Sequence, residues 1–169
     1  PYQRPELKVP ENFRGQSAAP DAKSLADLAW WDLYKDPALE KVVKAILKVK
    51  QIDKPQIEEA DLKTIYILDA RNQGIQDLSG LEKCPNLVEV KLSGNRIANL
   101  TSLAECKNIQ SLYLSANTIT DLAPLAGLVK LQHLELEKNQ IASLAGLEKL
   151  TNMRSLYISD NQISELTQL

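Results

Sequence analysis

The chain has 169 residues, of which 25% are charged, and its net charge at neutral pH is −2. This length corresponds to one domain, or to one domain with an appendage. A net charge of −2 gives no excess of basic residues of the kind that binds nucleic acid. No apolar run approaches the length of a membrane span, because the longest, within residues 42–47, is interrupted by Lys44. The composition therefore predicts no nucleic-acid partner and no transmembrane span.

Residues 1–35 predict an arm that carries one short helix. Residues 1–23 contain four prolines and show no periodicity, which is typical of an extended or disordered segment. Ser24 and Asp27 form an N-cap pair for a short helix that would carry Trp31. We expect the aromatic residues of this helix to pack on the end of the following domain.

Residues 36–62 predict a helical cap. Asp36 is a suitable N-cap residue, and Pro37 is favoured at the first helical position. Apolar residues follow at the spacing of one helix face, namely Leu39, Val42, Val43, Ile46 and Leu47. Beyond Pro55, residues 58–62 allow a second, shorter helical turn.

The remaining residues, 63–169, follow one repeated pattern. An asparagine recurs every 22 residues, at Asn95, Asn117, Asn139 and Asn161. Apolar residues precede each of these asparagines by eight, five and three positions and follow it by two, five and eight positions. A further copy lies upstream, where Gln73 takes the place of the asparagine. We expect this glutamine to weaken the polar ladder that the asparagines form.

The pattern resembles that of leucine-rich repeats. The resemblance implies an α/β solenoid, shaped as a horseshoe or arc of five coils, with short parallel strands on the concave face. A period of 22 residues leaves little room for a helix on the convex side, where we expect 3₁₀ turns and extended segments. Within each strand, the apolar side chains point to the core and their neighbours point outward. We expect the asparagine side chains to bind unpaired backbone groups, a structural role that we favour over a catalytic one.

The two cysteines obey the same period. Cys84 and Cys106 lie 22 residues apart, at positions that Leu128 and Leu150 occupy in later coils. One interpretation is that both are buried thiols that replace core leucines. The other is a disulfide between neighbouring coils, which an exported location would permit.

The outward strand positions form the candidate binding surface. They lie six, four and two residues before each asparagine position. From them we select as partner-binding residues Lys91, Tyr113, His133, Glu135, Glu137 and Tyr157. Tyrosine beside serine and a few charges is a composition suited to protein recognition. The alternative is that these residues are only the polar surface of a solvated sheet.

Neither a metal site nor an active site is predicted. His133, Glu135 and Glu137 are of metal-ligand type, but successive same-face residues on a strand lie about 7 Å apart, too far to converge on one ion. The chain has one histidine, no glycine-rich phosphate loop and no paired carboxylates in a predicted pocket. We therefore expect no metal, no cofactor and no enzyme activity.

Residues 36–81 resemble the helical cap and first coil of bacterial internalin-like leucine-rich repeat proteins. The resemblance rests on the helix start Asp36-Pro37-Ala38-Leu39-Glu40 and on the acidic turn Glu59-Ala60-Asp61-Leu62. It implies that residues 36–62 seal the N-terminal end of the core.

The arm resembles the mature N-terminus of outer-membrane efflux lipoproteins. The matching stretches are Tyr2-Gln3-Arg4-Pro5 and Trp30-Trp31-Asp32-Leu33-Tyr34. The channel helices and barrel strands of that family have no counterpart in the sequence. This resemblance implies a location in the bacterial cell envelope, either periplasmic or held at the outer membrane by a lipid anchor on a cysteine upstream of Pro1.

Together these observations predict a non-catalytic protein–protein interaction module of the bacterial cell envelope, which binds a protein or peptide through its concave sheet. A first alternative is a structural or assembly protein that forms a homodimer through its last coil. No polar cap follows Leu166 and Leu169, so we expect either that more chain follows in the native protein or that another molecule covers this edge. An uncovered parallel edge favours strand pairing. A second alternative, suggested by the arm, is an accessory to an envelope efflux assembly.

Overall fold

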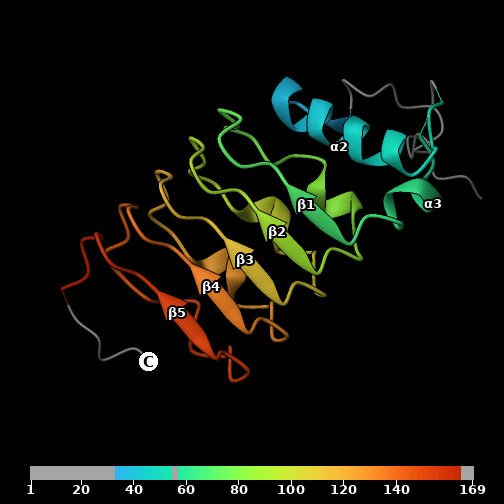
Figure 1. Cartoon of the computed structure of the whole chain (residues 1–169). Coiled ribbons are helices and arrows are strands. Elements are labelled where there is room, and N and C mark those ends of the chain that lie inside the picture. The colour runs from blue at the N-terminus through green and yellow to red at the C-terminus, as the bar shows by residue number, and fades with distance from the viewer. Residues whose placement is uncertain (1–32, 55–56, 165–169) are drawn as a thin grey trace, which may run out of the picture.

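The computed structural model describes residues 33–54 and 57–164 of the chain (Figure 1). The short helix predicted around Trp31 lies outside the described residues, as do Leu166 and Leu169. Leu33 and Tyr34, which belong to the predicted arm, are described and are buried in the core.

Among the described residues, helices α2 and α3 lie at the N-terminal end (Figure 1). Helix α2, Pro37–Val49, begins at Asp36, whose side chain accepts hydrogen bonds from two amides of the first turn at 2.9 and 3.3 Å. These bonds satisfy amides that have no partner within the helix. Helix α3, Glu59–Leu62, is a single turn. The side chains of α2 that are buried against the core are Leu39, Val43 and Leu47.

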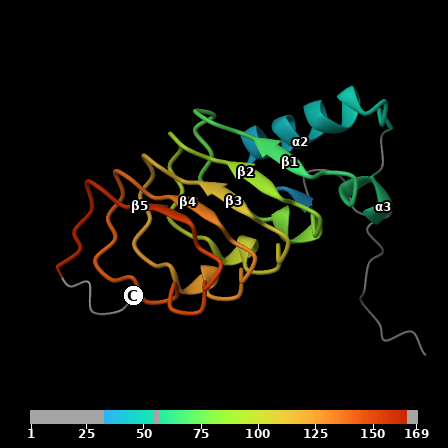
Figure 2. The same ribbon diagram turned by 60° about the horizontal axis from the view of Figure 1, so that its bottom comes forward.

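Five parallel strands form one sheet in chain order, and Figures 1 and 2 show them side by side along one face of the solenoid. The strands are β1 (Ile67–Asp69), β2 (Glu89–Lys91), β3 (Ser111–Tyr113), β4 (His133–Glu135) and β5 (Ser155–Tyr157). Each residue pairs with the residue 22 positions further along, as Leu112 does with Leu134. The repeat period of the sequence is therefore the strand register of the sheet.

The core lies directly beneath the sheet. In β1 to β4 the central residue is fully buried while both neighbours are partly or largely exposed, as the two-residue alternation of a strand requires. The chain returns through 3₁₀ turns, which are η2 (Leu81–Lys83), η3 (Thr101–Leu103) and η4 (Ala123–Leu125). The predicted α/β solenoid, with short parallel strands on one side and 3₁₀ or extended segments on the other, is confirmed.

The asparagines form a continuous ladder between coils. Asn117 Oδ1 accepts a hydrogen bond from the Ile97 amide at 3.0 Å, and its Nδ2 donates to the carbonyls of Leu92 and Leu114 at 3.1 and 2.9 Å. The Leu92 carbonyl also accepts from Asn95, at 2.7 Å. Each coil therefore shares a carbonyl between two amide groups. This arrangement keeps the buried turns free of unpaired backbone groups.

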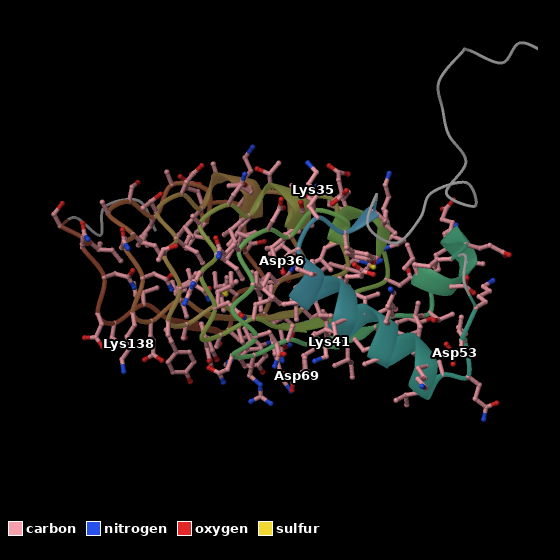
Figure 3. All side chains as sticks on the ribbon, turned by 90° about the horizontal axis from the view of Figure 1, so that it is seen from above. Lys35, Asp36, Lys41, Asp53, Asp69 and Lys138 are labelled. Atoms are coloured by element: carbon pink, nitrogen blue, oxygen red, sulfur yellow. The ribbon has the colours of Figure 1, made fainter. Side chains whose placement is uncertain are left out.

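The helical cap, rather than Gln73, binds the start of the first coil. Gln73 is exposed and donates to the Arg71 carbonyl at 3.0 Å, because no earlier coil lies within its reach. Instead, Asp36 Oδ2 accepts hydrogen bonds from the amides of Gln76 and Asp77 at 2.8 and 3.3 Å. One carboxylate thus caps α2 and also binds the first coil. Figure 3 labels Asp36 at the beginning of the helix.

Tyr34 also packs against the first coil. It is 1% exposed, and its hydroxyl lies 3.5 Å from the sulfur of Cys84. Gly80 approaches it so closely that an added Cβ would lie 2.5 Å from Tyr34 Cδ1, and the φ of Gly80 is +103°. Only glycine fits both the space and the left-handed backbone. The segment that contains Tyr34 is therefore part of the packed core.

Both cysteines are free and fully buried. The Cys106 thiol donates to the Leu81 carbonyl at 3.3 Å. Burial raises the pKa of Cys84 to about 11 and that of Cys106 to about 12. The structure therefore agrees with the interpretation of both cysteines as buried thiols and not with a disulfide between them.

The last described coil is less completely buried than those before it. Leu156, Ile158 and Ile163 are partly exposed, whereas their counterparts one coil earlier are fully buried. Those counterparts are Leu134, Leu136 and Ile141. Within the described part of the chain, β5 pairs with a strand on one side only.

Candidate functional site

Every outward position that the sequence pattern selected lies on the same side of the sheet. The strands repeat one register, so that residues 22 positions apart stand next to one another on the concave face. Asp69 is labelled in Figure 3 on this surface, at the end nearest helix α2. The partner-binding residues proposed from the sequence are therefore neighbours rather than scattered side chains.

An aromatic row crosses the last three strands. It consists of Tyr113 on β3, His133 on β4 and Tyr157 on β5. The His133 ring centroid lies 5.2 Å from that of Tyr113 and 5.5 Å from that of Tyr157. These are diagonal contacts between neighbouring strands, within reach of aromatic side chains. The three rings thus form a continuous aromatic surface across β3, β4 and β5.

Lys91 extends the aromatic row toward the helical cap. Its Nζ lies 5.8 Å from the centroid of the Tyr113 ring, within the range of a cation–π contact. Lys91 also forms a salt bridge of 2.9 Å with Glu89 on the same strand. The hydrogen bond to Glu89 raises the pKa of the Lys91 ammonium, which therefore stays charged.

The first coil carries a second ion pair of the same kind. Arg71 Nε and Nη2 donate to the two carboxylate oxygens of Asp69 at 2.9 and 2.6 Å. These hydrogen bonds hold the pKa of the Asp69 carboxyl below its ordinary value. The outward charges of the first two coils therefore cancel within each coil.

The fourth coil differs, because among the described residues its two carboxylates pair with no lysine or arginine, and only Glu135 has a histidine, His133, beside it. Glu135 Oε1 lies 3.2 Å from His133 Nε2, and Glu137 Oε1 accepts a hydrogen bond from the Ser159 hydroxyl at 2.9 Å. Across residues 33–54 and 57–164, no lysine or arginine lies within salt-bridge distance of either glutamate. A negative charge is thus concentrated beside the aromatic row.

A hollow of about 410 Å³ lies on this surface. Four of the six residues selected from the sequence line it, namely Lys91, Tyr113, Glu135 and Glu137. His133 and Tyr157 lie on the same face but do not line the hollow. Its other lining residues are Arg71, Ser93 and Ser115, which the selected set omits. The 22-residue period already places these three among the outward positions, two residues before an asparagine position, but they are not among the residues selected as partner-binding.

Ser115 carries an unsatisfied group at this hollow. Its hydroxyl oxygen is buried and has no hydrogen-bond partner among the described residues. Buried polar atoms without a partner are uncommon in folded proteins.

The described residues contain no cluster of metal ligands and no membrane-spanning helix. Among the residues described, no three or more His, Cys, Asp or Glu side chains are placed to hold a metal ion. His133 and Glu135 are close together, but no third ligand joins them. No helix in the described part of the chain is both long and apolar enough to cross a membrane.

A family model described as leucine-rich repeats (2 copies) matches the chain at residues 86–127, 107–148 and 129–169. No curated protein sequence is similar enough to count as a match.

Solved structures of leucine-rich repeat proteins share the fold. The internalin InlF of Listeria monocytogenes aligns with a TM-score of 0.69 at 20% identity, over 86% of this chain and 50% of its own. The functional domain of InlJ of the same organism, which includes a cysteine ladder, aligns with a TM-score of 0.71 at 24% identity. That alignment covers 83% of this chain and 30% of InlJ.

A leucine-rich repeat protein of Leptospira interrogans aligns with a TM-score of 0.59 at 33% identity, over 64% of this chain and 29% of its own. The chain thus spans half or less of the length of these three proteins. None of them is an efflux lipoprotein, so the resemblance of the arm to that family has no support from these comparisons.

Proposed function

Because the chain is an internalin-like leucine-rich repeat protein, we propose that it is a non-catalytic module that binds a protein or peptide on its concave face. Leucine-rich repeat proteins are typically interaction modules without enzymatic activity. The proposal extends this general role to a particular surface, made of Lys91 and the aromatic row beside Glu135 and Glu137.

The observation that carries the proposal is the aromatic row. Tyr113, His133 and Tyr157 stand on three neighbouring strands, and both tyrosine rings contact the His133 ring between them. The leucines beneath β3 and β4, Leu112 and Leu134, are fully buried. Aromatic side chains held rigidly in this way lose little conformational entropy when a partner covers them. Tyr157 is 48% exposed, which leaves much of its ring for such a contact. Tyrosines of this kind are frequent among the residues that dominate binding energy.

The test is capture of partners by an immobilised chain from an extract of bacterial envelope proteins. The double variant Tyr113→Ala with Tyr157→Ala should lose the captured protein. A matched control is Tyr66→Ala with Val129→Ala, which removes side chains that are 52% and 50% exposed but lie outside the selected outward positions. Unchanged capture by the first variant, or equal loss from both, contradicts binding through this face.

We also propose that the protein acts in the bacterial cell envelope. Support comes from the resemblance of residues 1–35 to efflux lipoproteins. Fractionation of cells that express the complete reading frame, followed by mass spectrometry of the N-terminal peptide, tests this directly. A lipid-modified or signal-cleaved N-terminus is the expected result, and an unprocessed protein in the cytosolic fraction contradicts it.

Self-association along β5 is a second candidate function. The observation in its favour is the partial exposure of Leu156, Ile158 and Ile163 beside a strand that is paired on one side. Exposed strand edges over apolar side chains promote pairing between chains. Light scattering over a range of concentrations should then show a dimer, and a strict monomer at high concentration removes this candidate.

The third candidate is a role as an accessory to an efflux assembly, which again depends on the arm. Its test is deletion of residues 1–32, because a longer deletion would remove Leu33 and Tyr34 from the core. A loss of efflux in cells that carry the deletion supports the role, whereas an unchanged phenotype disposes of it.

A further inference from the structure

We infer that the partner presents an arginine side chain to the fourth coil, where Glu135 on β4 and Glu137 just after this strand lie near the rings of Tyr113 and Tyr157. This inference rests on the proposed function, since it assigns the chemistry of a partner on the same face. It follows from the charge balance of the coils and from the tyrosine rings on the strands next to Glu135.

The charge balance along the concave face is uneven in one place. Asp69 is paired with Arg71, and Glu89 is paired with Lys91. The third and fifth coils present only uncharged residues at their outward positions, which are Ser111, Tyr113 and Ser115, and Ser155, Tyr157 and Ser159. The fourth coil alone carries two carboxylates, without a lysine or arginine partner in the described part of the chain. A cation from the partner would complete the pattern that the first two coils complete by themselves.

Tyrosine rings flank the unbalanced charge on both sides. In the sheet, Tyr113 and Tyr157 both pair directly with Glu135. Both tyrosine rings contact the His133 ring, whose Nε2 lies 3.2 Å from Glu135 Oε1, so that the rings and the carboxylate belong to one cluster. A cation that reaches Glu135 therefore also meets an aromatic face, which adds a cation–π attraction to the ionic one.

The geometry favours arginine over lysine. A guanidinium is planar, so it can stack on a tyrosine ring while it donates several hydrogen bonds. The two glutamates line one hollow, so that a single guanidinium can donate to both carboxylates. A lysine ammonium supplies a point charge that cannot stack in this way.

An acidic partner fits the same face poorly. Arg71 and Lys91, the two cations that line the hollow, already hold Asp69 and Glu89. Because each cation is already neutralised by its internal partner, a carboxylate from outside would gain less attraction than from an unpaired cation. It would also approach the two glutamates of the fourth coil and be repelled by them.

The experiment uses three capped peptides of the form Ac-Gly-Ser-X-Ser-Gly-NH₂, in which X is arginine, lysine or citrulline. Citrulline keeps the shape of arginine and removes its charge. Each peptide is titrated into the isotopically labelled chain up to about millimolar concentrations and followed by NMR. We expect saturable shifts at the amides of Tyr113, Glu135 and Tyr157 with the arginine peptide, weaker ones with lysine and none with citrulline.

Matched variants separate this site from the general charge of the protein. Glu135→Gln with Glu137→Gln should weaken binding of the arginine peptide about fivefold or more, as expected for loss of a partly exposed ion pair and its cation–π neighbours. Asp53→Asn with Glu105→Gln makes the same change in net charge at two exposed residues elsewhere and should leave binding within about twofold. Tyr113→Phe should retain binding, since it keeps the ring, whereas Tyr113→Leu should weaken it.

Three results would overturn the inference: equal binding of the citrulline peptide, absence of saturable shifts with arginine, or equal weakening by both double variants. Equal binding of the lysine peptide overturns the assignment to arginine. The proposed function is tested apart from this by partner capture. A captured protein that depends on Tyr113 and Tyr157 but tolerates Glu135→Gln with Glu137→Gln keeps the proposed function and rejects the arginine contact.

Discussion

At the scale of single residues, the hydrogen bonds that a side chain makes depend on whether a neighbouring coil lies on each side of it. Asn117 lies between two coils and satisfies backbone groups of both, whereas Gln73 has a coil on one side only and is left exposed. Cys106 occupies a leucine position of the repeat and satisfies a carbonyl with its thiol. The stability contributed by each residue therefore depends on how deeply its partners are buried.

Removal of a ladder asparagine should cost more in the middle of the solenoid than at its last described coil. Asn117→Ala leaves the buried Ile97 amide without its partner and should lower the free energy of unfolding by about 3 kcal/mol. Asn161 makes the same set of bonds at a less buried site, so that Asn161→Ala should cost about 1 kcal/mol. Urea unfolding of both variants measures the difference, and equal costs would contradict the role of burial.

The two thiols should be slow to react in the native protein. Cys84 and Cys106 are buried, and burial raises their pKa values to about 11 and 12, so at pH 8 few thiolates exist and reagents have little access. Mass spectrometry after iodoacetamide treatment should show almost no label on the folded chain and two labels after unfolding in urea without reductant. Rapid labelling of the folded chain contradicts the burial, and an unfolded chain that takes no label would show a disulfide instead.

At the scale of elements, the helical cap is joined to the solenoid through a few shared side chains. The Asp36 carboxylate binds two amides of α2 through one oxygen and two amides of the first coil through the other. Tyr34 packs against Gly80, and its hydroxyl lies 3.5 Å from the sulfur of Cys84. Cap and first coil should therefore unfold together rather than as separate units.

Asp36→Asn isolates the bond between the cap and the first coil. The amide oxygen can still cap α2, but the amide nitrogen cannot accept hydrogen bonds from Gln76 and Asp77. We expect a loss of about 2 kcal/mol at neutral pH, the magnitude typical of hydrogen bonds to a charged group. Chemical denaturation checks this value, with Asp53→Asn as the control for a carboxylate that is exposed.

The difference between the wild type and Asp36→Asn should depend on pH. Partial burial raises the pKa of Asp36, but the four backbone amides lower it by more, so that the net value lies below the ordinary 3.8. A lowered folded-state pKa contributes stability that is fully present above the unfolded-state pKa and is lost as the pH falls through the folded-state pKa. The difference should thus be constant from pH 7 to 5 and shrink below about pH 4. A difference that grows on acidification would contradict the assignment.

The sequence predicts those elements that obey the period, and it misses contacts between parts that do not. Leu112 and Leu134 could be assigned to the core because the 22-residue spacing fixes the strand register. The second role of Asp36 and the burial of Tyr34 could not be predicted, since they depend on how the cap is oriented on the first coil. For the concave face, the period gives the outward positions. The period does not predict that Glu89 pairs with Lys91 while Glu135 pairs with His133. These pairs depend on side-chain conformation.

At the scale of the whole molecule, the chain presents its strands side by side, as Figure 2 shows, above a continuous apolar core. The charges on this surface cancel at the end nearest the cap and become negative toward β4, beside the aromatic row. A partner that covers the face would thus meet rings and carboxylates together. The surface is rigid because each strand is held by its neighbours and by the asparagine ladder.

The most direct test of binding through the concave face is site-specific photo-crosslinking in cells of the native host. A photoreactive phenylalanine derivative replaces Tyr157 in one variant and Val129, a residue of similar exposure away from the selected positions, in another. We expect illumination to yield a discrete protein adduct from position 157 and none from position 129. Adducts from position 129 alone, or equally from both positions, would contradict the account.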